Sequence, residues 1–412
     1  MAQAGKTYDV TVNGYAFGGE TIGRLPDGRA VFVPFAIPGE RVRVALVTEK
    51  RGFARARLVE VLDPSPQRIS PRCRHFGVCG GCDYQHMPYE TQLEAKRAVV
   101  RDQLQRIGGI ADPVVQPVVA CPEPYYYRNT VQFHQDKDGR LGYYRHDGQG
   151  VLAIAECHLP LPLLNQVWPQ VELEPIPDLE RIGLRQGVED EVLLWMASEN
   201  PEPPEMELDL PISTVYLSPD GALILAGDNH VVLEVLGRPF RVSAGSFFQV
   251  NTVMAAEMAN HLLHHLPLTP DTTLLDVYCG VGLFSAFLAP RVKSCIGIEL
   301  SESAVNDFAA NLDEFDNVSV YLGAAEDVLP NLDVRADVLL VDPPREGLDR
   351  RALDAIVTLA PPVIAYVSCD PATLARDLKR LLAAGYALEQ VTPFDLFPQT
   401  YHVECVVFLR RE

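Results

Sequence analysis

Two side chains capable of covalent or acid–base chemistry stand beside predicted strands near the C-terminus. Cys369 separates a predicted strand, 363–368, from a helix that Asp370 can cap. A thiol near a helix N-terminus ionises more readily, although the Asp370 carboxylate opposes this and a single cysteine is more often a small buried residue. Glu404 lies inside an apolar strand, 402–409, where a carboxylate is costly to bury without a partner or a function. We expect Cys369 to be a nucleophile and Glu404 a general base; the alternative for Glu404 is a solvent-facing place on an edge strand.

A glycine-containing loop follows the first predicted strand of the same region. From Asp276 the chain runs through Gly280 and Gly282, which let the backbone turn sharply and approach a ligand. Glu299 ends the next predicted strand, where a carboxylate can accept hydrogen bonds from ribose hydroxyls. The layout suits NAD or S-adenosylmethionine, but the dinucleotide pattern has a third glycine where this chain has Ser285. We therefore expect S-adenosylmethionine as the cofactor, with Gly280, Gly282 and Glu299 in its site.

Another strand end carries Asp342, which is followed by two prolines and then Arg345. The prolines end the strand and stiffen the loop that holds the carboxylate. Methyltransferases that act on exocyclic amines have a similar sequence with an aromatic residue in the fourth place. Because the fourth residue here is Arg345, methylation of an amine is disfavoured.

A thiol, a carboxylate base and a methyl donor together suit one reaction, the methylation of carbon 5 of uracil. This carbon is a poor nucleophile toward a methyl sulfonium. Addition of the Cys369 thiolate at carbon 6 turns the ring into an enolate, which makes carbon 5 nucleophilic. After methyl transfer Glu404 removes the proton from carbon 5, and the thiolate is eliminated.

A separate group of cysteines has the spacing of a metal centre. Cys73, Cys79 and Cys82 lie close together among glycines, and Cys157 follows much later. Four thiolates suit either zinc or an iron–sulfur cluster. Zinc sites more often use paired short spacings, so three close cysteines and one distant cysteine favour a [4Fe–4S] cluster, with zinc as the alternative.

The C-terminal region, 241–412, alternates predicted strands and helices, which is typical of a doubly wound α/β domain. Strands are expected at 273–278, 294–299, 318–322, 336–341, 363–368, 387–392 and 402–409. The last connection is too short for a helical crossover, so we expect the last two strands to be antiparallel. Ligands of such sheets bind at the carboxyl ends of the strands, where Glu299, Asp342 and Cys369 fall.

Residues 1–62 are predicted to form a small OB-like β-barrel from short alternating runs separated by glycine and proline turns. Basic side chains alternate with apolar ones there, so one face could follow a phosphate backbone; the alternative is a solvent face of mixed charge. The basic side chains of that pattern are Arg41, Arg43, Lys50, Arg51, Arg55 and Arg57.

Residues 63–240 are predicted to form a β-rich central domain that contains the clustered cysteines. A helix is expected at about 88–107, with Lys96, Arg97, Arg101 and Arg106 off its apolar face. The acidic, proline-rich stretch 171–210 is expected to be solvated and peripheral.

Length and charge restrict the class of protein further. The 412 residues suit two or three domains, with 47% apolar and 22% charged residues as in globular proteins. A net charge of −20 argues against a nucleic-acid partner, but residues 1–110 carry 16 Lys and Arg against 11 Asp and Glu. A membrane span and a secretory signal are both absent from the sequence pattern, so we expect a cytoplasmic monomer without disulfides.

Over nearly its whole length the chain resembles the iron–sulfur-containing RNA (uracil-C5)-methyltransferases, which make 5-methyluridine in ribosomal or transfer RNA. Six motifs in order carry the resemblance: 73–82, 246–251, 276–282, 341–347, 368–377 and 402–406. The resemblance implies a Rossmann-like class I methyltransferase domain, an N-terminal TRAM domain that binds RNA, and a central domain that holds a [4Fe–4S] cluster. Members with a TRAM domain act more often on ribosomal RNA, so by analogy 23S rRNA is the expected substrate, with tRNA as the alternative.

The resemblance also implies roles for individual residues. Four cysteines would be the cluster ligands: Cys73, Cys79, Cys82 and Cys157. Four side chains would line the S-adenosylmethionine site: Gln249, Tyr278, Glu299 and Asp342. Cys369 would be the nucleophile and Glu404 the base. Two positions depart from the family pattern, Leu283 where a polar residue is common and Asp370 where asparagine is common.

Two other functions stay open on the sequence alone. One is methylation of a different RNA base atom, in which case a Cys369→Ala variant would keep its activity. The other is a non-catalytic RNA-binding protein, which the joint presence of Cys369, Glu404 and Asp342 makes improbable.

Overall fold

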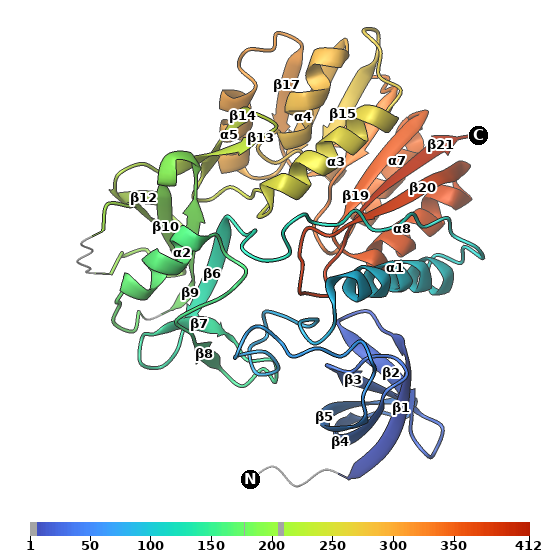
Figure 1. Ribbon diagram of the computed structural model, residues 1–412. Helices are drawn as coiled ribbons and strands as arrows, with labels where there is room; N and C mark the ends of the chain where they lie inside the picture. Colours follow the sequence, from blue (N-terminus) through green and yellow to red (C-terminus); the bar gives the residue numbers. More distant parts are fainter. Residues whose placement is uncertain (1–5, 177, 205–209) are drawn as a thin grey trace.

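The computed structural model describes residues 6–176, 178–204 and 210–412, which form a barrel, a central sheet and a C-terminal α/β sheet (Figure 1). The barrel closes in the order β1-β2-β3-β5-β4. Its strands are β1 (Thr7–Tyr15), β2 (Glu20–Arg24), β3 (Ala30–Pro34), β4 (Arg41–Glu49) and β5 (Phe53–Asp63). Alternate valines fill its interior, because successive side chains of a strand point to opposite faces: Val10, Val12, Val31, Val33, Val42 and Val44. The predicted five-stranded barrel is confirmed.

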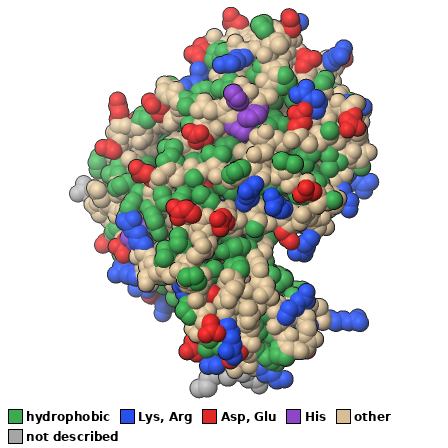
Figure 2. Space-filling model, turned by 45° about the vertical axis from the view of Figure 1, so that its right-hand side comes forward, with side chains coloured by type: hydrophobic (Ala, Val, Ile, Leu, Met, Phe, Trp, Pro, Cys, Tyr) green, Lys and Arg blue, Asp and Glu red, His purple; other side chains and the backbone are tan. Residues whose placement is uncertain are grey.

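The described surface of the barrel carries charges of both signs. Arg43 pairs with Asp9 at 2.8 Å and with Glu60 at 3.2 Å, and Arg55 pairs with Glu20. Acidic and basic side chains are likewise intermixed over the face in Figure 2. Within the described part of the chain, three of the predicted cations have no ion-pair partner: Lys50, Arg51 and Arg57. These three are the ones that keep their charge available for a phosphate backbone.

The helix α1 (Tyr89–Arg106) joins the central region to the C-terminal sheet, because it packs against α8 (Pro371–Ala383). Val100 and Leu104 are buried in that contact, as the apolar periodicity predicts.

The prediction that Lys96 lies away from the buried face of this helix was wrong, because its side chain is fully buried. Its ammonium group pairs with Asp395 Oδ1 at 2.5 Å and donates to the Phe397 carbonyl at 3.0 Å. A buried ammonium is tolerated only with such partners. The partner is 299 positions away in the chain, so the local sequence around Lys96 does not reveal it.

We expect the Lys96→Ala variant to lose about 3–5 kcal/mol of unfolding free energy, because it leaves the Asp395 carboxylate buried without a partner. Arg101→Ala, on the exposed side of the same helix, should change stability by less than about 0.5 kcal/mol. Chemical denaturation followed by circular dichroism measures both changes. Equal midpoints for the two variants would show that the buried pair contributes nothing to stability.

A seven-stranded sheet forms most of the central region of the chain, in the order β12-β11-β10-β9-β6-β7-β8. Its strands are β6 (Thr130–Gln135), β7 (Leu141–Tyr144), β8 (Val151–Ala153), β9 (Leu179–Gln186), β10 (Val192–Ser198), β11 (Ser213–Ser218) and β12 (Gly221–Ala226). The short helix α2 (Pro162–Val167) covers it, and Trp168 and Phe133 pack together in the core between them.

The expectation that 171–210 is entirely solvated was wrong for its described strands. All seven residues of β10 are buried, and Ile182 to Arg185 of β9 are buried as well. The described acidic side chains of the stretch lie mainly in the turns around these strands, so the average charge of the stretch hides two apolar runs. Residues 177 and 205–209 of this stretch lie outside the described residues.

A hairpin and a helix lead into the C-terminal sheet. The hairpin is β13 (His230–Val235) and β14 (Arg238–Ser243), and the helix is α3 (Thr252–His265), which Asn251 caps. The predicted domain boundary after residue 240 falls within β14, and this strand packs against α5 (Glu302–Asn311).

The C-terminal sheet has the order β17-β16-β15-β18-β19-β21-β20 and a core on each face. Its strands are β15 (Thr273–Val277), β16 (Ser294–Glu299), β17 (Val318–Leu322), β18 (Val338–Val341), β19 (Val363–Ser368), β20 (Tyr386–Phe394) and β21 (Glu404–Arg411). The remaining helices are α4 (Leu283–Leu288), α6 (Ala325–Val328) and α7 (Arg350–Leu359). Strands β15 to β19 are parallel, whereas β21 runs antiparallel to both β19 and β20, so the predicted topology is confirmed.

This topology brings the carboxyl ends of β15, β16, β18 and β19 to one edge, where polar side chains from distant segments can meet. Among the described helices, none combines the length and the apolar character needed to cross a membrane.

Candidate functional site

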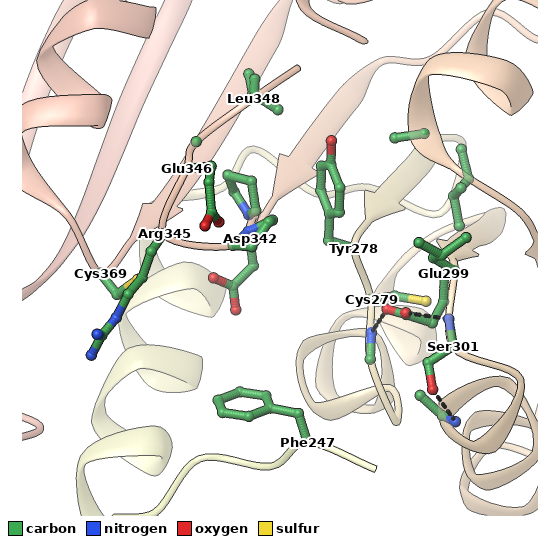
Figure 3. A pocket seen from close by; sticks show the side chains of 18 of the residues that line it. Phe247, Tyr278, Cys279, Glu299, Ser301, Asp342, Arg345, Glu346, Leu348 and Cys369 are labelled. Carbon is green, nitrogen blue, oxygen red and sulfur yellow. Dashed lines mark hydrogen bonds between the residues drawn. The ribbon is translucent and has the colours of Figure 1, made fainter. Parts of the chain in front are cut away.

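A cavity of about 1200 Å³ opens at this edge of the C-terminal sheet (Figure 3). All but one of the predicted catalytic and cofactor-binding residues line this cavity. Those that line it are Gln249, Tyr278, Gly280, Glu299, Asp342, Cys369 and Glu404. Gln249 comes from the segment between the β13–β14 hairpin and α3. Each of the others ends, follows or begins a strand of the sheet. The cavity therefore brings the predicted nucleophile, the predicted base and the glycine loop into one space.

Glu299 fixes the glycine loop on one side of the cavity. Its carboxylate accepts hydrogen bonds from the backbone N–H groups of Gly280 at 2.9 Å and of Ser301 at 2.8 Å (Figure 3). A carboxylate oxygen has two lone pairs, so each oxygen can still accept a second hydrogen bond from a bound hydroxyl. Tyr278 precedes this loop in a left-handed conformation, with φ of 65°.

Gly282 is the exception, because it does not line the cavity. It precedes α4 with φ of 89°, and a Cβ atom there would lie 2.4 Å from Leu312 and 2.9 Å from Phe308. The glycine is thus required by close packing under the loop. The neighbouring Ser285 donates to the buried Asp276 carboxylate at 2.6 Å, which gives the serine a structural reason to replace glycine.

Asp342 lies in the centre of the cavity, after β18 (Figure 3). Burial, together with the nearby carboxylates of Asp276 and Glu299, raises the pKa of Asp342 to about 7. The cavity therefore holds several acidic groups whose negative charges oppose one another.

Cys369 stands between β19 and α8, and Asp370 caps that helix as predicted by accepting from the N–H groups of Ala372 and Thr373. Burial and then the carboxylates of Glu404 and Asp342 raise the pKa of the Cys369 thiol to about 12. The Asp370 carboxylate acts in the same direction but contributes less than those two.

Glu404 lies in the last strand as predicted, but it is the first residue of β21, which begins two residues later than the predicted start at 402. Its side chain is buried, and β21 lies between β19 and β20, which excludes the solvent-facing edge position. Burial and the Asp342 carboxylate raise the pKa of Glu404 well above its usual range. A carboxyl group with a raised pKa is suited to take up a proton near neutral pH.

Three residues of the cavity were missed as site residues by sequence reasoning. Arg345 extends beside Cys369 (Figure 3), and its charge lowers the pKa of both Cys369 and Glu404. His402 lies near it, and Phe247 is 68% exposed across the cavity from Asp342. The sequence signal for Arg345 was its unusual place after the two prolines; exposed aromatic and histidine side chains gave no comparable signal.

The four clustered cysteines line a second cavity, of about 320 Å³. Backbone N–H groups of His75 and Gly81 lie 3.4 Å from the sulfur atoms of Cys73 and Cys79, and the Gln85 amide lies 3.3 Å from Cys82. Such donors are suited to thiolates. Across the described residues, however, no group of three or more His, Cys, Asp or Glu side chains could hold a metal ion, so the predicted ligands stay a prediction.

We expect the Glu299→Gln variant to bind S-adenosylmethionine about tenfold more weakly or worse. One carboxylate oxygen becomes an NH₂ group that faces a backbone N–H, and a charged acceptor for the ribose is lost; a hydrogen bond to a charged group contributes about 1.5–3 kcal/mol. Isothermal titration calorimetry measures the Kd. The exposed Glu302, in the first turn of α5, offers the matched Glu302→Gln control, and equal affinities of the two variants would remove Glu299 from the site.

Comparison with known proteins agrees with this arrangement. The model of the tRNA (uracil-5-)-methyltransferase family matches residues 210–335 and 331–412, and that of the TRAM domain matches residues 2–59. An uncharacterized RNA methyltransferase of Thermosynechococcus vestitus is 35% identical, over 99% of this chain and 98% of its own length. Another, from Halalkalibacterium halodurans, is 33% identical over 97% and 96%.

Among solved structures, the chain is similar to the tRNA (uracil-54, C5)-methyltransferase of Pyrococcus abyssi in complex with S-adenosyl-L-homocysteine. The TM-score is 0.74 and the identity 24%, over 98% of this chain and 100% of that one. At this identity the likeness concerns the fold, which both chains share along their whole length.

Proposed function

Because the chain belongs to the tRNA (uracil-5-)-methyltransferase family and is an S-adenosylmethionine-dependent RNA (uracil-C5)-methyltransferase, we propose that it acts through a covalent adduct of Cys369. The observation that carries this mechanism is the presence of Cys369 and Glu404 in one cavity with the Glu299-bound glycine loop.

In the proposed reaction the thiol of Cys369 loses its proton to solvent, and the thiolate sulfur adds to carbon 6 of the uracil ring. The electron pair of the 5,6 double bond would move toward the carbonyl oxygen on carbon 4. The resulting enolate would attack the methyl group through carbon 5, the bond between the methyl group and the sulfonium sulfur would break, and S-adenosyl-L-homocysteine would leave. Glu404 then removes the proton from carbon 5, the 5,6 double bond re-forms, and the thiolate leaves. Arg345 is placed to offset the negative charge that the thiolate and the enolate bring into the acidic cavity.

The residues around the glycine loop would hold S-adenosylmethionine. Glu299 would accept hydrogen bonds from the ribose hydroxyls, and Gly280 would allow the backbone to approach the cofactor closely. The rest of the cofactor would be surrounded by Tyr278, Gln249 and Asp342.

We propose 23S rRNA as the substrate and keep tRNA as the alternative. The TRAM-type barrel supports an RNA substrate, whereas the family description and the Pyrococcus abyssi enzyme both name tRNA. The test is nucleoside mass spectrometry for 5-methyluridine after incubation with S-adenosylmethionine and, separately, unmodified 23S rRNA or unmodified tRNA. Product in 23S rRNA alone supports the proposal, product in tRNA alone replaces it with the alternative, and a methylated nucleoside other than 5-methyluridine overturns the carbon 5 chemistry.

We also propose that Cys73, Cys79, Cys82 and Cys157 hold a [4Fe–4S] cluster. All four residues line one cavity, and N–H donors lie beside the sulfur atoms of three of them. Methyl transfer includes no redox step that needs an iron–sulfur cluster. A bound cluster would therefore have a structural role, in which it cross-links the loops of the central region. Iron and sulfide analysis of anaerobically purified protein tests this, with Cys82→Ser expected to lose the iron and Cys121→Ser, outside that cavity, expected to keep it. Zinc in place of iron would overturn the cluster.

A further inference from the structure

The connection between β20 and β21, residues 395–403, carries the chain into Glu404 and is held from several sides. Lys96 of α1 binds its first part through Asp395 and the Phe397 carbonyl. The N–H of Tyr401 donates to Asp83 at 3.2 Å. Because separate elements fix this connection, the side chains that it presents to the cavity are fixed as well.

His402 is the last ring of this connection before the base, and it lines the cavity. Its Nε2 atom lies 3.4 Å from Nη2 of Arg345. An arginine side chain has donors only, so the imidazole nitrogen must be the acceptor. His402 therefore presents a lone pair to the one cation that lowers the pKa of both Cys369 and Glu404.

The imidazole of His402 packs against two aromatic rings. Tyr401 lies 4.1 Å from it between ring centroids, and Phe397 lies 5.8 Å away edge-on. Tyr401 in turn contacts Phe17 of the barrel at 5.9 Å, in a T-shaped arrangement. The ring position is thus set by the connection and by the barrel, independently of Arg345.

The surroundings of His402 also keep it neutral. The charged groups that face it are Arg345, Arg128 of the central region and Lys96 of α1, and together with burial they lower the pKa of His402 to about 3. A neutral imidazole can accept a hydrogen bond, whereas an imidazolium could only repel the guanidinium.

We propose that His402 is a positioning residue, whose Nε2 atom holds the Arg345 guanidinium beside Cys369. The inference rests on the proposed role of Cys369. Without this acceptor Arg345, which is exposed on its other side, is free to turn toward solvent. The thiolate then loses its nearby cation while Glu404, Asp342 and Asp370 still face it.

The test is the rate at which iodoacetamide alkylates Cys369 at pH 9 without RNA, read on the Cys369 peptide by mass spectrometry. His402→Phe keeps a ring beside Tyr401 but removes the acceptor, and His402→Gln restores an acceptor without the ring. We expect His402→Phe and Arg345→Ala to be alkylated about tenfold more slowly than wild type, equivalent to about one pKa unit, and the double variant to be no slower. His402→Gln should recover most of the rate.

Other outcomes overturn the positioning role. If His402→Phe is alkylated at the wild-type rate, the reactivity of Cys369 needs only the ring at position 402 and not its nitrogen acceptor. If the double variant is alkylated more slowly than both single variants, His402 and Arg345 affect Cys369 independently. S-adenosylmethionine affinity serves as the folding control, and it should stay within about twofold in each variant. Wild-type formation of 5-methyluridine tests the proposed function separately, since the alkylation rates do not depend on RNA or on methyl transfer.

Discussion

Replacing Cys369 by alanine is expected to lower 5-methyluridine formation by about 10⁴-fold or more, because carbon 5 then has no route to become nucleophilic. S-adenosylmethionine affinity should stay within about twofold, since the thiol lies on the opposite side of Asp342 from the glycine loop (Figure 3). Single-turnover methylation of RNA and isothermal titration calorimetry measure the two effects.

A matched control for this variant is Cys121→Ala, which removes another buried thiol that lines neither cavity. It should methylate RNA at nearly the wild-type rate. Retained activity of the Cys369→Ala variant would contradict the covalent route and would favour methylation of a base atom that is nucleophilic by itself.

The pH dependence of the wild-type enzyme follows from the same residue. The pKa of Cys369 is raised to about 12, so the thiol is almost entirely protonated near neutral pH. The pKa of Glu404 is also raised, and this group must lose its proton before it can act as a base. Cys369 and Glu404 must each lose a proton before they can react. We therefore expect kcat/KM to rise from pH 6 to pH 9.

The positions of Glu299, Asp342 and Cys369 could be predicted from the sequence because each ends or follows an apolar run. Leu274 to Val277 and Val363 to Ser368 are buried on both faces of the sheet, and strands of this kind are read directly from continuous apolar residues. Once the strands are known to be parallel, their carboxyl ends must meet. The cavity that contains Glu299, Asp342 and Cys369 is therefore a consequence of topology.

What the sequence could not reveal depends on pairs that are distant along the chain. Lys96 looks like a solvent-exposed residue of an amphipathic helix, and only its contact with Asp395 explains its burial. The two apolar strands within the acidic stretch 171–210 were hidden for a different reason, since charge averaged over forty residues says little about runs of four to seven. Arg345 and His402 illustrate the first case inside the site, because they are 57 positions apart.

The Glu404→Gln variant should fail at a later step than Cys369→Ala. We expect it to transfer the methyl group but not to release the RNA. Glutamine has the shape of the protonated glutamic acid and fits its buried place, but it cannot take the proton from carbon 5. The methylated adduct should therefore accumulate as a complex of RNA and protein that resists SDS. Gel electrophoresis with labelled RNA measures the complex, and mass spectrometry of the linked nucleotide shows whether the methyl group is already in place.

The same substitution should also accelerate the first step, which makes the prediction specific to the base. Among the carboxylates that raise the pKa of Cys369, Glu404 contributes most, so removal of its charge lowers that pKa and favours the thiolate. Glu346→Gln, at the exposed rim of the same cavity, should turn over normally and leave no complex. A Glu404→Gln enzyme that releases 5-methyluridine at a rate within a few-fold of wild type would assign proton removal to another group, and Asp342, with its pKa near neutrality, would be the first to examine.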